Sequence, residues 1–217
     1  MLSTKDLPEG NIPKTFNPGN HLAKITRIEL APGPAYKPGS YQVNIHLEGS
    51  DLGPDFEGFY KDAINKTGER FSGQVGRVRM SEYPFADGET AKKVPVNRDR
   101  SILRGLQNIA KVLGKEEELN KIEVETIEEF VPLASEILSG DTEINWCVAG
   151  KEYKNRDGYT NYDLFLPATK GMGYAYEAVG ATPSRLLQFD PRVHIKVKAE
   201  AAPVAEFEPK EDNSFNL

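Results

Sequence analysis

The sequence predicts a mixed α+β protein that is mainly β-sheet with helices inserted into it. Segments in which apolar and polar residues alternate, as in strands, lie on both sides of a segment with helical spacing. The 19 glycines and 15 prolines among the 217 residues indicate many turns. The content of hydrophobic residues, 38%, is low, but a chain of this length can still bury one core.

Three segments in the first half of the chain are expected to be strands. Residues 22–30 alternate, but the apolar side changes between Ile25 and Ile28. One extra residue moves all following side chains to the other face, so this change predicts a β-bulge. Residues 41–48 alternate without a fault, and residues 74–80 predict a third strand.

Two helices are expected next, after a long loop over residues 81–97. Apolar residues at helical spacing over residues 102–113 predict a helix that ends at Gly114. Residues 126–138 predict a second helix, because Thr126-Ile-Glu-Glu129 has the form of a capping box. Pro132 lies inside that segment and favours a later start.

A β-hairpin follows the helices. Residues 143–153 and 159–167 form its two expected strands, and Asp157-Gly158 lies in the turn, where glycine readily adopts the positive φ that such turns need. Residues 168–187 show no clear period. Residues 193–197 predict one last strand.

The expected order is therefore strand, strand, strand, helix and two-stranded hairpin. This is the order of the OB-fold, a five-stranded, partly open barrel that commonly binds oligonucleotides. The expected bulge agrees, because the first strand of an OB-fold bends to pair on both sides of the barrel. A mixed α/β sheet with the same order is the alternative.

These features divide the chain into four segments. Residues 1–20 form an extended arm, and residues 21–167 form the OB-like domain with a helical insertion at 98–138. Residues 168–198 form a C-terminal extension. Residues 199–217 are rich in alanine, proline and glutamate, a composition that favours a disordered acidic tail.

The composition also indicates a cytoplasmic protein. No stretch approaches 18 uncharged apolar residues, as a transmembrane helix would need. The first ten residues lack the apolar stretch of a signal peptide, so secretion by that route is not expected. Cys147 is the single cysteine, which excludes an internal disulfide and fits a reducing compartment.

The net charge of −6 is unevenly distributed. From Glu200 onward the chain has five acids and one base, so this end carries −4 and the preceding 199 residues carry only −2. Binding depends on local charge more than on the total. The charge therefore permits a nucleic-acid partner.

Three motifs, in their order, resemble a known family. They are the glycine-led first strand (Asn17-Pro-Gly-Asn20 into Ile25-Thr-Arg-Ile28-Glu29), the helix Leu106–Gly114, and the hairpin Val148–Tyr162. Together they resemble phage-encoded single-stranded DNA-binding proteins of the OB-fold type, those of tailed phages of gut bacteria in particular. The resemblance covers residues 17–167. It implies coating of unwound DNA in replication and recombination, with an acidic tail that recruits partners. The second helical segment (116–138) and residues 168–198 depart from the pattern.

Single strands bind to cationic grooves in which bases stack on aromatic side chains. Two stretches combine such residues, one in the third strand and its surroundings and the other in the hairpin. The candidate nucleic-acid-binding residues are Tyr60, Lys61, Arg77, Arg79, Tyr83, Phe85, Lys151, Tyr153, Lys154, Arg156, Tyr159 and Tyr162. In strand geometry Arg77 and Arg79 share a face, opposite Val78 and Met80. The competing interpretation is a solvated surface with half-buried tyrosines.

Other residues predict structure more than chemistry. Tyr41 and Trp146 alternate with aliphatic residues and are expected in the core, and Cys147 is expected to be shielded and inert. The three histidines are far apart in sequence and have no cysteine partners, so neither a metal nor another cofactor is expected. No phosphate-binding loop or catalytic constellation is present, so the chain is not expected to be an enzyme. A structural or scaffold protein of a virion and a metal-dependent DNA-processing enzyme are the alternatives.

The acidic tail combines its charges with three apolar residues, Phe207, Phe215 and Leu217. Short acidic segments with such residues can occupy the protein's own cationic groove, or insert an aromatic side chain into a partner's pocket. We therefore expect the tail to restrain DNA binding or to recruit replication or recombination proteins.

Overall fold

The computed structural model describes residues 16–33, 35, 40–49, 75–83, 94–168 and 173–197. Within these residues the fold is mixed α+β and is dominated by one sheet. Its elements are β1 (Gly19–Pro32), β2 (Tyr41–Gly49), β3 (Val75–Tyr83), α1 (Val94–Leu113), α2 (Glu116–Leu119), α3 (Ile127–Leu138), β4 (Glu143–Lys154), β5 (Thr160–Phe165), β6 (Tyr176–Ala178), α4 (Pro191–His194) and β7 (Ile195–Lys196).

The sheet contains a closed ring of hydrogen-bonded strands. Its path runs from β1 through β2, β3 and β5 to β4, and β4 pairs with β1 again. Within the ring only β3 and β5 run parallel. β6 and β7 also pair with β4, outside the ring. The predicted order of three strands, a helical segment and a hairpin is confirmed.

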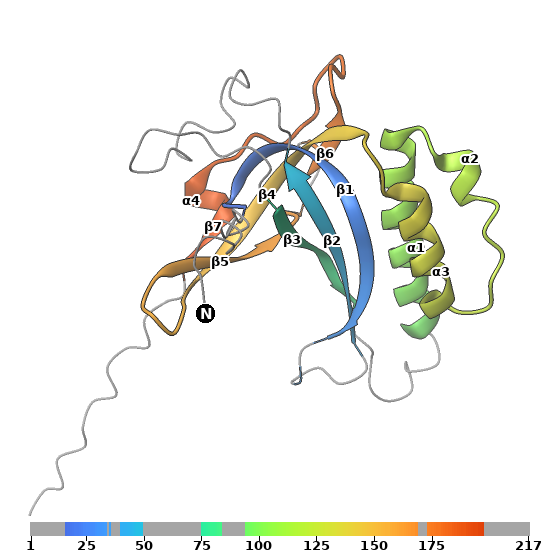
Figure 1. Cartoon of the computed structure of the whole chain (residues 1–217), viewed down its shortest axis with the longest axis horizontal. Coiled ribbons are helices and arrows are strands. Elements are labelled where there is room, and N and C mark those ends of the chain that lie inside the picture. Colours follow the sequence, from blue (N-terminus) through green and yellow to red (C-terminus); the bar gives the residue numbers. More distant parts are fainter. Residues whose placement is uncertain are drawn as a thin grey trace, which may run out of the picture.

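The predicted bulge in β1 is confirmed as a register shift between Ile25 and Arg27. Before it, residues 19–24 pair with β4, and beyond it β1 continues along β2 alone. Ile25 and Ile28 are both buried although three positions separate them. The bulge thus lets one strand bend between two partners while its apolar side chains stay inside (Figure 1).

The helical insertion binds the backbone at this bulge. The backbone N–H of Ile28 donates to Ser135 Oγ of α3 at 2.8 Å. The carbonyl of Ile25 accepts from the backbone N–H of Gly140 at 3.0 Å. The pairing of β1 with β4 ends at Lys24, and buried backbone groups that no neighbouring strand pairs need other partners. α3 and the turn after it supply those partners.

α1 and α3 lie side by side on one side of the sheet, and α3 packs against β1 (Figure 1). α1 begins at Val94, inside the segment 81–97 that was expected to be a loop, and earlier than the expected insertion boundary at residue 98. It ends as predicted: Gly114 has a φ of +69°, and the N–H of Lys115 bonds to the carbonyl of Ala110 at 2.8 Å. Among the described helices, none is both long and apolar enough to cross a membrane.

The capping box of α3 is confirmed. Thr126 Oγ1 accepts from the backbone N–H of Glu129, and the Glu129 carboxylate accepts from the N–H of Thr126. The expectation that Pro132 delays the helix is wrong, because α3 begins at Ile127 and continues through this proline. Pro132 is exposed, and the reciprocal cap together with the buried apolar face of α3 outweighs one missing helical hydrogen bond.

The core lies inside the ring and under the helices. Trp146 is fully buried, as predicted, and its indole N–H donates to the carbonyl of Ala23 at 3.0 Å. Tyr41 is half-buried and packs against this core. The structure describes residues 16–20 of the arm that was assigned to residues 1–20. Phe16 is buried in the core, and its backbone N–H donates a hydrogen bond to the carbonyl of Val75.

The C-terminal extension contributes to the same sheet through β6 and β7. The last strand, expected over residues 193–197, contains only Ile195 and Lys196, and the preceding residues form the short helix α4. Asp190 caps that turn by accepting from the N–H of Arg192, and Pro191 occupies its first position. These signals for the start of a helix outweigh the preference of the β-branched residues in this segment for a strand. The tail at 199–217 lies outside the described residues.

We expect Ser135→Ala to lower the free energy of unfolding by about 1–3 kcal/mol, because the buried N–H of Ile28 then loses its acceptor. Denaturant titration measures this change. Ser139→Ala is the matched control: its buried hydroxyl has no hydrogen-bond partner in the described part of the chain, so its removal should change stability little. Equal effects of the two substitutions would contradict the role given to Ser135.

Candidate nucleic-acid interface

The pairings of the ring define one continuous outer face, on the side of the strands away from the core. Residues opposite each other in a sheet point to the same side, so the registers identify which side chains share this face. The outer face consists of Arg27, Glu29, Asn44, His46, Arg77, Arg79, Lys151, Tyr153, Asn161, Asp163, Phe165 and Lys196.

Arg77 and Arg79 lie together on the outer face, as the sequence predicted, while Val78 between them is fully buried. They line a cavity of about 240 Å³ at the centre of β2, β3 and β5. Asp163 and Asn44 line the same cavity. The two guanidinium groups are therefore placed among hydrogen-bonding side chains.

The second predicted cluster meets the first on this face. Arg77 of β3 and Tyr153 of β4 line one cavity of about 270 Å³, together with Asn161 and Asp163. Tyr153 is 47% exposed, so its ring is accessible to a ligand. Arg77 and Tyr153 are far apart in sequence, and the ring brings them to one site because β5 pairs with both of their strands.

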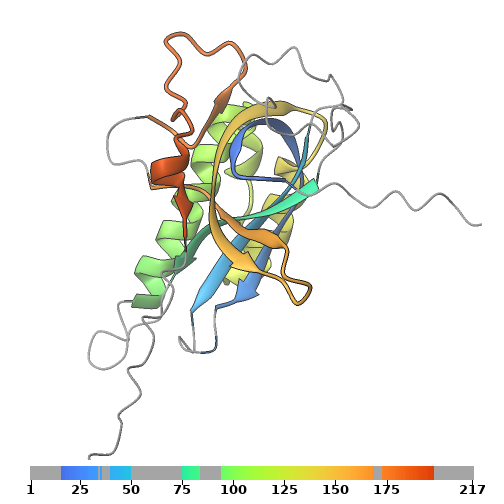
Figure 2. The ribbon, with the colours of Figure 1, turned by 90° about the vertical axis from the view of Figure 1, so that its left-hand side faces the viewer.

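The tip of the β4–β5 hairpin presents further cationic and aromatic groups to solvent, on the side away from α1 and α3 (Figures 1 and 2). The side chain of Asn155 holds the turn by accepting from the N–H groups of Asp157 (3.0 Å) and Tyr159 (2.8 Å). Gly158 has the predicted positive φ, +82°. Tyr159 is 71% exposed, and Arg156 is exposed beside it.

Two hairpin residues are more constrained than the sequence suggested. Lys154 Nζ donates to Thr160 Oγ1 at 2.6 Å, which holds it along the hairpin. Tyr162 lies on the core side of β5, where a Cβ at Gly150 would be 3.2 Å from its side chain. Tyr162 nevertheless lines the cavity that Arg77 and Tyr153 share, while the exposed rings of the hairpin are those of Tyr153 and Tyr159.

Several candidate residues lie beyond what the structure describes. Tyr83 belongs to β3 opposite Tyr41, but its side chain is not among the described ones. The remaining candidates outside the described residues are Tyr60, Lys61, Phe85, Phe207, Phe215 and Leu217.

Sequence reasoning missed residues at both ends of the outer face. Phe165 of β5 pairs with Arg79, and Lys196 Nζ lies 4.8 Å from the centre of the Phe165 ring. Lys196 also pairs with Lys151, so β7 adds a cation beside the hairpin. Neither residue carries a local signal, because only the pairing of distant strands places them here.

At the other end of the face, Arg27 and His46 form a polar network with Glu29. Arg27 Nη2 lies 2.8 Å from Glu29 Oε2 and 3.1 Å from His46 Nε2. Partial burial raises the pKa of Glu29, but hydrogen bonds from His46 and Asn44 outweigh it and leave that pKa below its ordinary value. Glu29 is therefore a carboxylate that holds the Arg27 guanidinium in place. The bulge predicted from Ile25 and Ile28 was the one sequence signal for this cluster.

Groups that could support other chemistry are few in the described residues. This part of the chain holds no group of three or more histidine, cysteine, aspartate or glutamate side chains that could bind a metal ion. Cys147 is fully buried, and burial raises the pKa of its thiol to about 12. The thiolate is the nucleophilic form, so this cysteine is shielded, as expected.

A scan of the chain against protein-family models and a search of curated proteins found no match. The functional assignment therefore depends on the geometry of the outer face.

We expect Cys147 to resist thiol reagents in the native protein at pH 8, because the folded state both covers the sulfur and disfavours its thiolate. In denaturant the same reagent should label one thiol per chain. Mass spectrometry after timed labelling measures both states. Fast stoichiometric labelling without denaturant would show that β4 opens readily or that Cys147 is accessible.

Proposed function

We propose that this protein binds single-stranded DNA on its outer face and that its ring is a five-stranded barrel of the OB type. The order of pairing, the parallel contact of β3 with β5 and the bend in β1 support the barrel. OB-folds commonly bind oligonucleotides on the face of strands 2 and 3 and on the adjacent loops. The outer face extends over those strands and over the β4–β5 hairpin.

The main support for this proposal is that Arg77 and Tyr153 line one cavity. A single strand offers phosphates on one side and unstacked bases on the other. Arginine pairs with phosphate through several fixed donors, and an exposed tyrosine ring provides a stacking surface for any base. A site with both groups adjacent can therefore hold one nucleotide by its backbone and by its base.

The chemistry of the outer face favours single strands over a rigid duplex. The exposed rings of Tyr153 on this face and of Tyr159 at the hairpin tip contribute only if bases are unpaired and free to stack. The cations of the outer face alternate with the carboxylates of Glu29 and Asp163, so phosphates must reach separate positions. A flexible single strand can adjust its backbone to such a pattern, and a duplex cannot.

The biological role follows from the resemblance described above and is part of the same proposal. The protein would coat unwound DNA during phage replication and recombination, in the cytoplasm of the host. Residues 199–217 would restrain binding or recruit replication or recombination proteins. The same stacking chemistry also accommodates RNA, so competition between DNA and RNA oligonucleotides should accompany the binding experiments.

Removing three exposed cations should reduce the salt dependence of binding. We expect Arg77→Ala/Lys151→Ala/Arg156→Ala to lower the slope of log affinity against log salt by about two units for a poly-dT oligonucleotide, because each phosphate contact on a single strand contributes about 0.7. Fluorescence anisotropy at several salt concentrations measures the slope.

The matched control for this experiment removes three exposed cations, Arg100 and Arg104 of α1 and Lys121 in the turn after α2, and it should keep the original slope. No binding of the unmodified protein to poly-dT would refute the proposal. Metal-dependent degradation of the oligonucleotide would instead favour a DNA-processing enzyme.

Removing the hairpin rings should weaken binding without changing its salt dependence. We expect Tyr153→Ala/Tyr159→Ala to cost about 1–3 kcal/mol for each base that no longer stacks, while the salt slope is unchanged because no phosphate contact is lost. Tyr153→Phe/Tyr159→Phe keeps both rings and should retain the affinity. Equal affinities for the Ala and Phe variants would show that these tyrosines do not stack on bases.

A further inference from the structure

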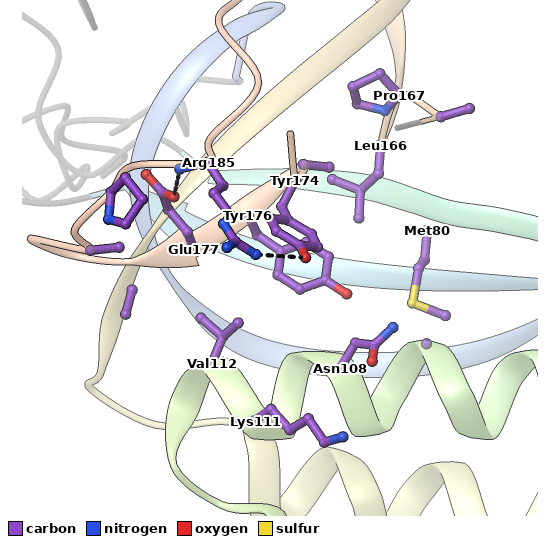
Figure 3. Close-up of a pocket in the computed structure, with 16 residues that line it drawn as sticks. Met80, Asn108, Lys111, Val112, Leu166, Pro167, Tyr174, Tyr176, Glu177 and Arg185 are labelled. Carbon is purple, nitrogen blue, oxygen red and sulfur yellow. Dashed lines mark hydrogen bonds between the residues drawn. The ribbon is translucent and has the colours of Figure 1, made fainter. Parts of the chain in front are cut away.

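A third cavity, here called the α1 pocket, lies on the helix side of the sheet and shares no residue with the outer face. Its volume is about 700 Å³, and it lies between α1, the ends of β3 and β5, and the segment 173–187. Figure 3 shows Asn108 and Val112 of α1 facing the rings of Tyr174 and Tyr176 across it. Its position and size make it a candidate binding site separate from the proposed DNA site.

Hydrogen bonds hold the segment that forms one wall of the α1 pocket. The backbone N–H of Tyr174 donates to the carbonyl of Arg185 at 2.5 Å, and the N–H of Leu187 donates to the carbonyl of Tyr174 at 2.8 Å. The carboxylate of Glu177 accepts from Ser184 Oγ at 2.5 Å and from the N–H of Arg185 at 2.6 Å. The wall is thus formed before a ligand binds, which lowers the ordering cost of binding.

More than half of the lining of the α1 pocket is apolar. Met80, Val112 and Leu166 contribute aliphatic or thioether surface from three different elements. The ring of Tyr176 also lines the pocket and packs against Trp146 of the core, with the two ring centres 5.4 Å apart. This environment suits a large apolar side chain such as phenylalanine.

Two cations border this apolar surface. Arg185 is exposed, and its Nη1 lies 3.4 Å from the hydroxyl of Tyr174 (Figure 3). Lys111 is exposed and has a surface ion pair with Glu116 at 3.4 Å, an interaction worth about 0–1 kcal/mol. Among the described residues, Glu177 is the one acid that lines the pocket, and it is 8% exposed and already accepts two hydrogen bonds. The rim therefore favours an acidic ligand.

One segment of this chain has the matching chemistry. Residues 206–217 carry four acids and one base, with Phe207 near one end and Phe215 near the other. An acidic segment with separated phenylalanines offers apolar groups for the pocket and carboxylates for its rim. The cavity beside Arg77 and Arg79 is smaller, about 240 Å³, and is lined mainly by polar side chains, so it offers a phenylalanine much less apolar surface.

The same segment is long enough to reach the α1 pocket. Lys196 pairs with Lys151 of β4, and Tyr176 pairs with Trp146, five residues earlier on that strand. Five residues of a strand span about 17 Å. The eleven residues from Lys196 to Phe207 can extend over about 36 Å, so even the first of the two phenylalanines can enter the pocket.

We propose that residues 206–217 dock in the α1 pocket of the same chain, with a phenylalanine ring against Val112 and Tyr176 and with carboxylates beside Lys111 and Arg185. The tail then lies on the helix side of the molecule and leaves the outer face open. The acidic charge of the tail, taken alone, had suggested that the tail competes directly with DNA for the cationic groove. Docking in the α1 pocket involves no such competition.

Paramagnetic broadening in NMR spectra tests this proposal on the full chain without DNA. A nitroxide is attached at Asn213→Cys, and the buried Cys147 is not expected to react. We expect selective loss of amide signals around Val112 and Ala178, and unchanged signals in the hairpin at Asp157. Loss of signals at the hairpin instead, or at neither place, would overturn the proposal.

Charge reversal provides the matched comparison. Lys111→Glu/Arg185→Glu should restore most of the lost pocket signals, and the wall should survive because its hydrogen bonds come from the backbone of Arg185 and not from its guanidinium. Lys121→Glu/Arg156→Glu makes the same change in charge away from the pocket and should leave the broadening as it was. Equal effects of both pairs of substitutions would show that unspecific charge attraction holds the tail, and this would refute the docking site.

A mixed sample distinguishes one chain from two. Isotope-labelled protein without nitroxide is mixed with unlabelled protein that carries it, so broadening can arise only between molecules. We expect none at the pocket, and broadening as strong as in the singly labelled chain would overturn docking within one chain. None of these measurements involves DNA, so a failure of the docking proposal is distinguishable from a failure of the proposed function.

Discussion

The bend of β1 at its bulge is the constraint on which the rest of the sheet depends. One strand pairs with β4 before the bulge and continues along β2 beyond it, and this double pairing closes the ring. Past Lys24, where the pairing with β4 ends, buried backbone groups of β1 are costly unless they find other partners. Ser135 and Gly140 provide those partners, so the helical insertion stabilises the bend as well as covering the core.

Closure of the ring in turn decides which side chains can act together. β5 pairs with β3 on one edge and with β4 on the other, so side chains from three distant segments meet on the outer face. Arg77, Asp163 and Tyr153 then surround one cavity. The rigidity of paired strands fixes the spacing of these groups, while the hairpin tip, with Tyr159, extends the face into solvent. A site built this way joins a fixed cationic centre to an exposed aromatic end.

The helix side of the molecule has a different chemistry. The cavities of the outer face are lined mainly by polar groups, whereas the larger α1 pocket combines an apolar lining with two cations. The segment 173–187 makes this pocket possible, because β6 attaches it to β4 and the Glu177 carboxylate ties its two arms together. The extension thus adds one cation, Lys196, to the outer face and most of one wall to the α1 pocket. The proposed DNA site and the proposed docking site of the tail therefore share no residue.

The sequence by itself determined the local features: the bulge, the capping box at Thr126, the helix end at Gly114 and the turn at Gly158. Each depends on a few neighbouring residues with strong conformational preferences, so spacing alone reveals it. The sequence also identified Arg77 and Tyr153 as candidate nucleic-acid-binding residues, because such a prediction needs only the chemical type of the side chain. Only the tertiary structure decided that these two share a cavity, that Tyr162 packs against the core beside that cavity, and that Phe165 and Lys196 join the outer face. Those outcomes depend on pairing between strands far apart in the chain, and no local pattern encodes which residue of one strand lies beside which residue of another.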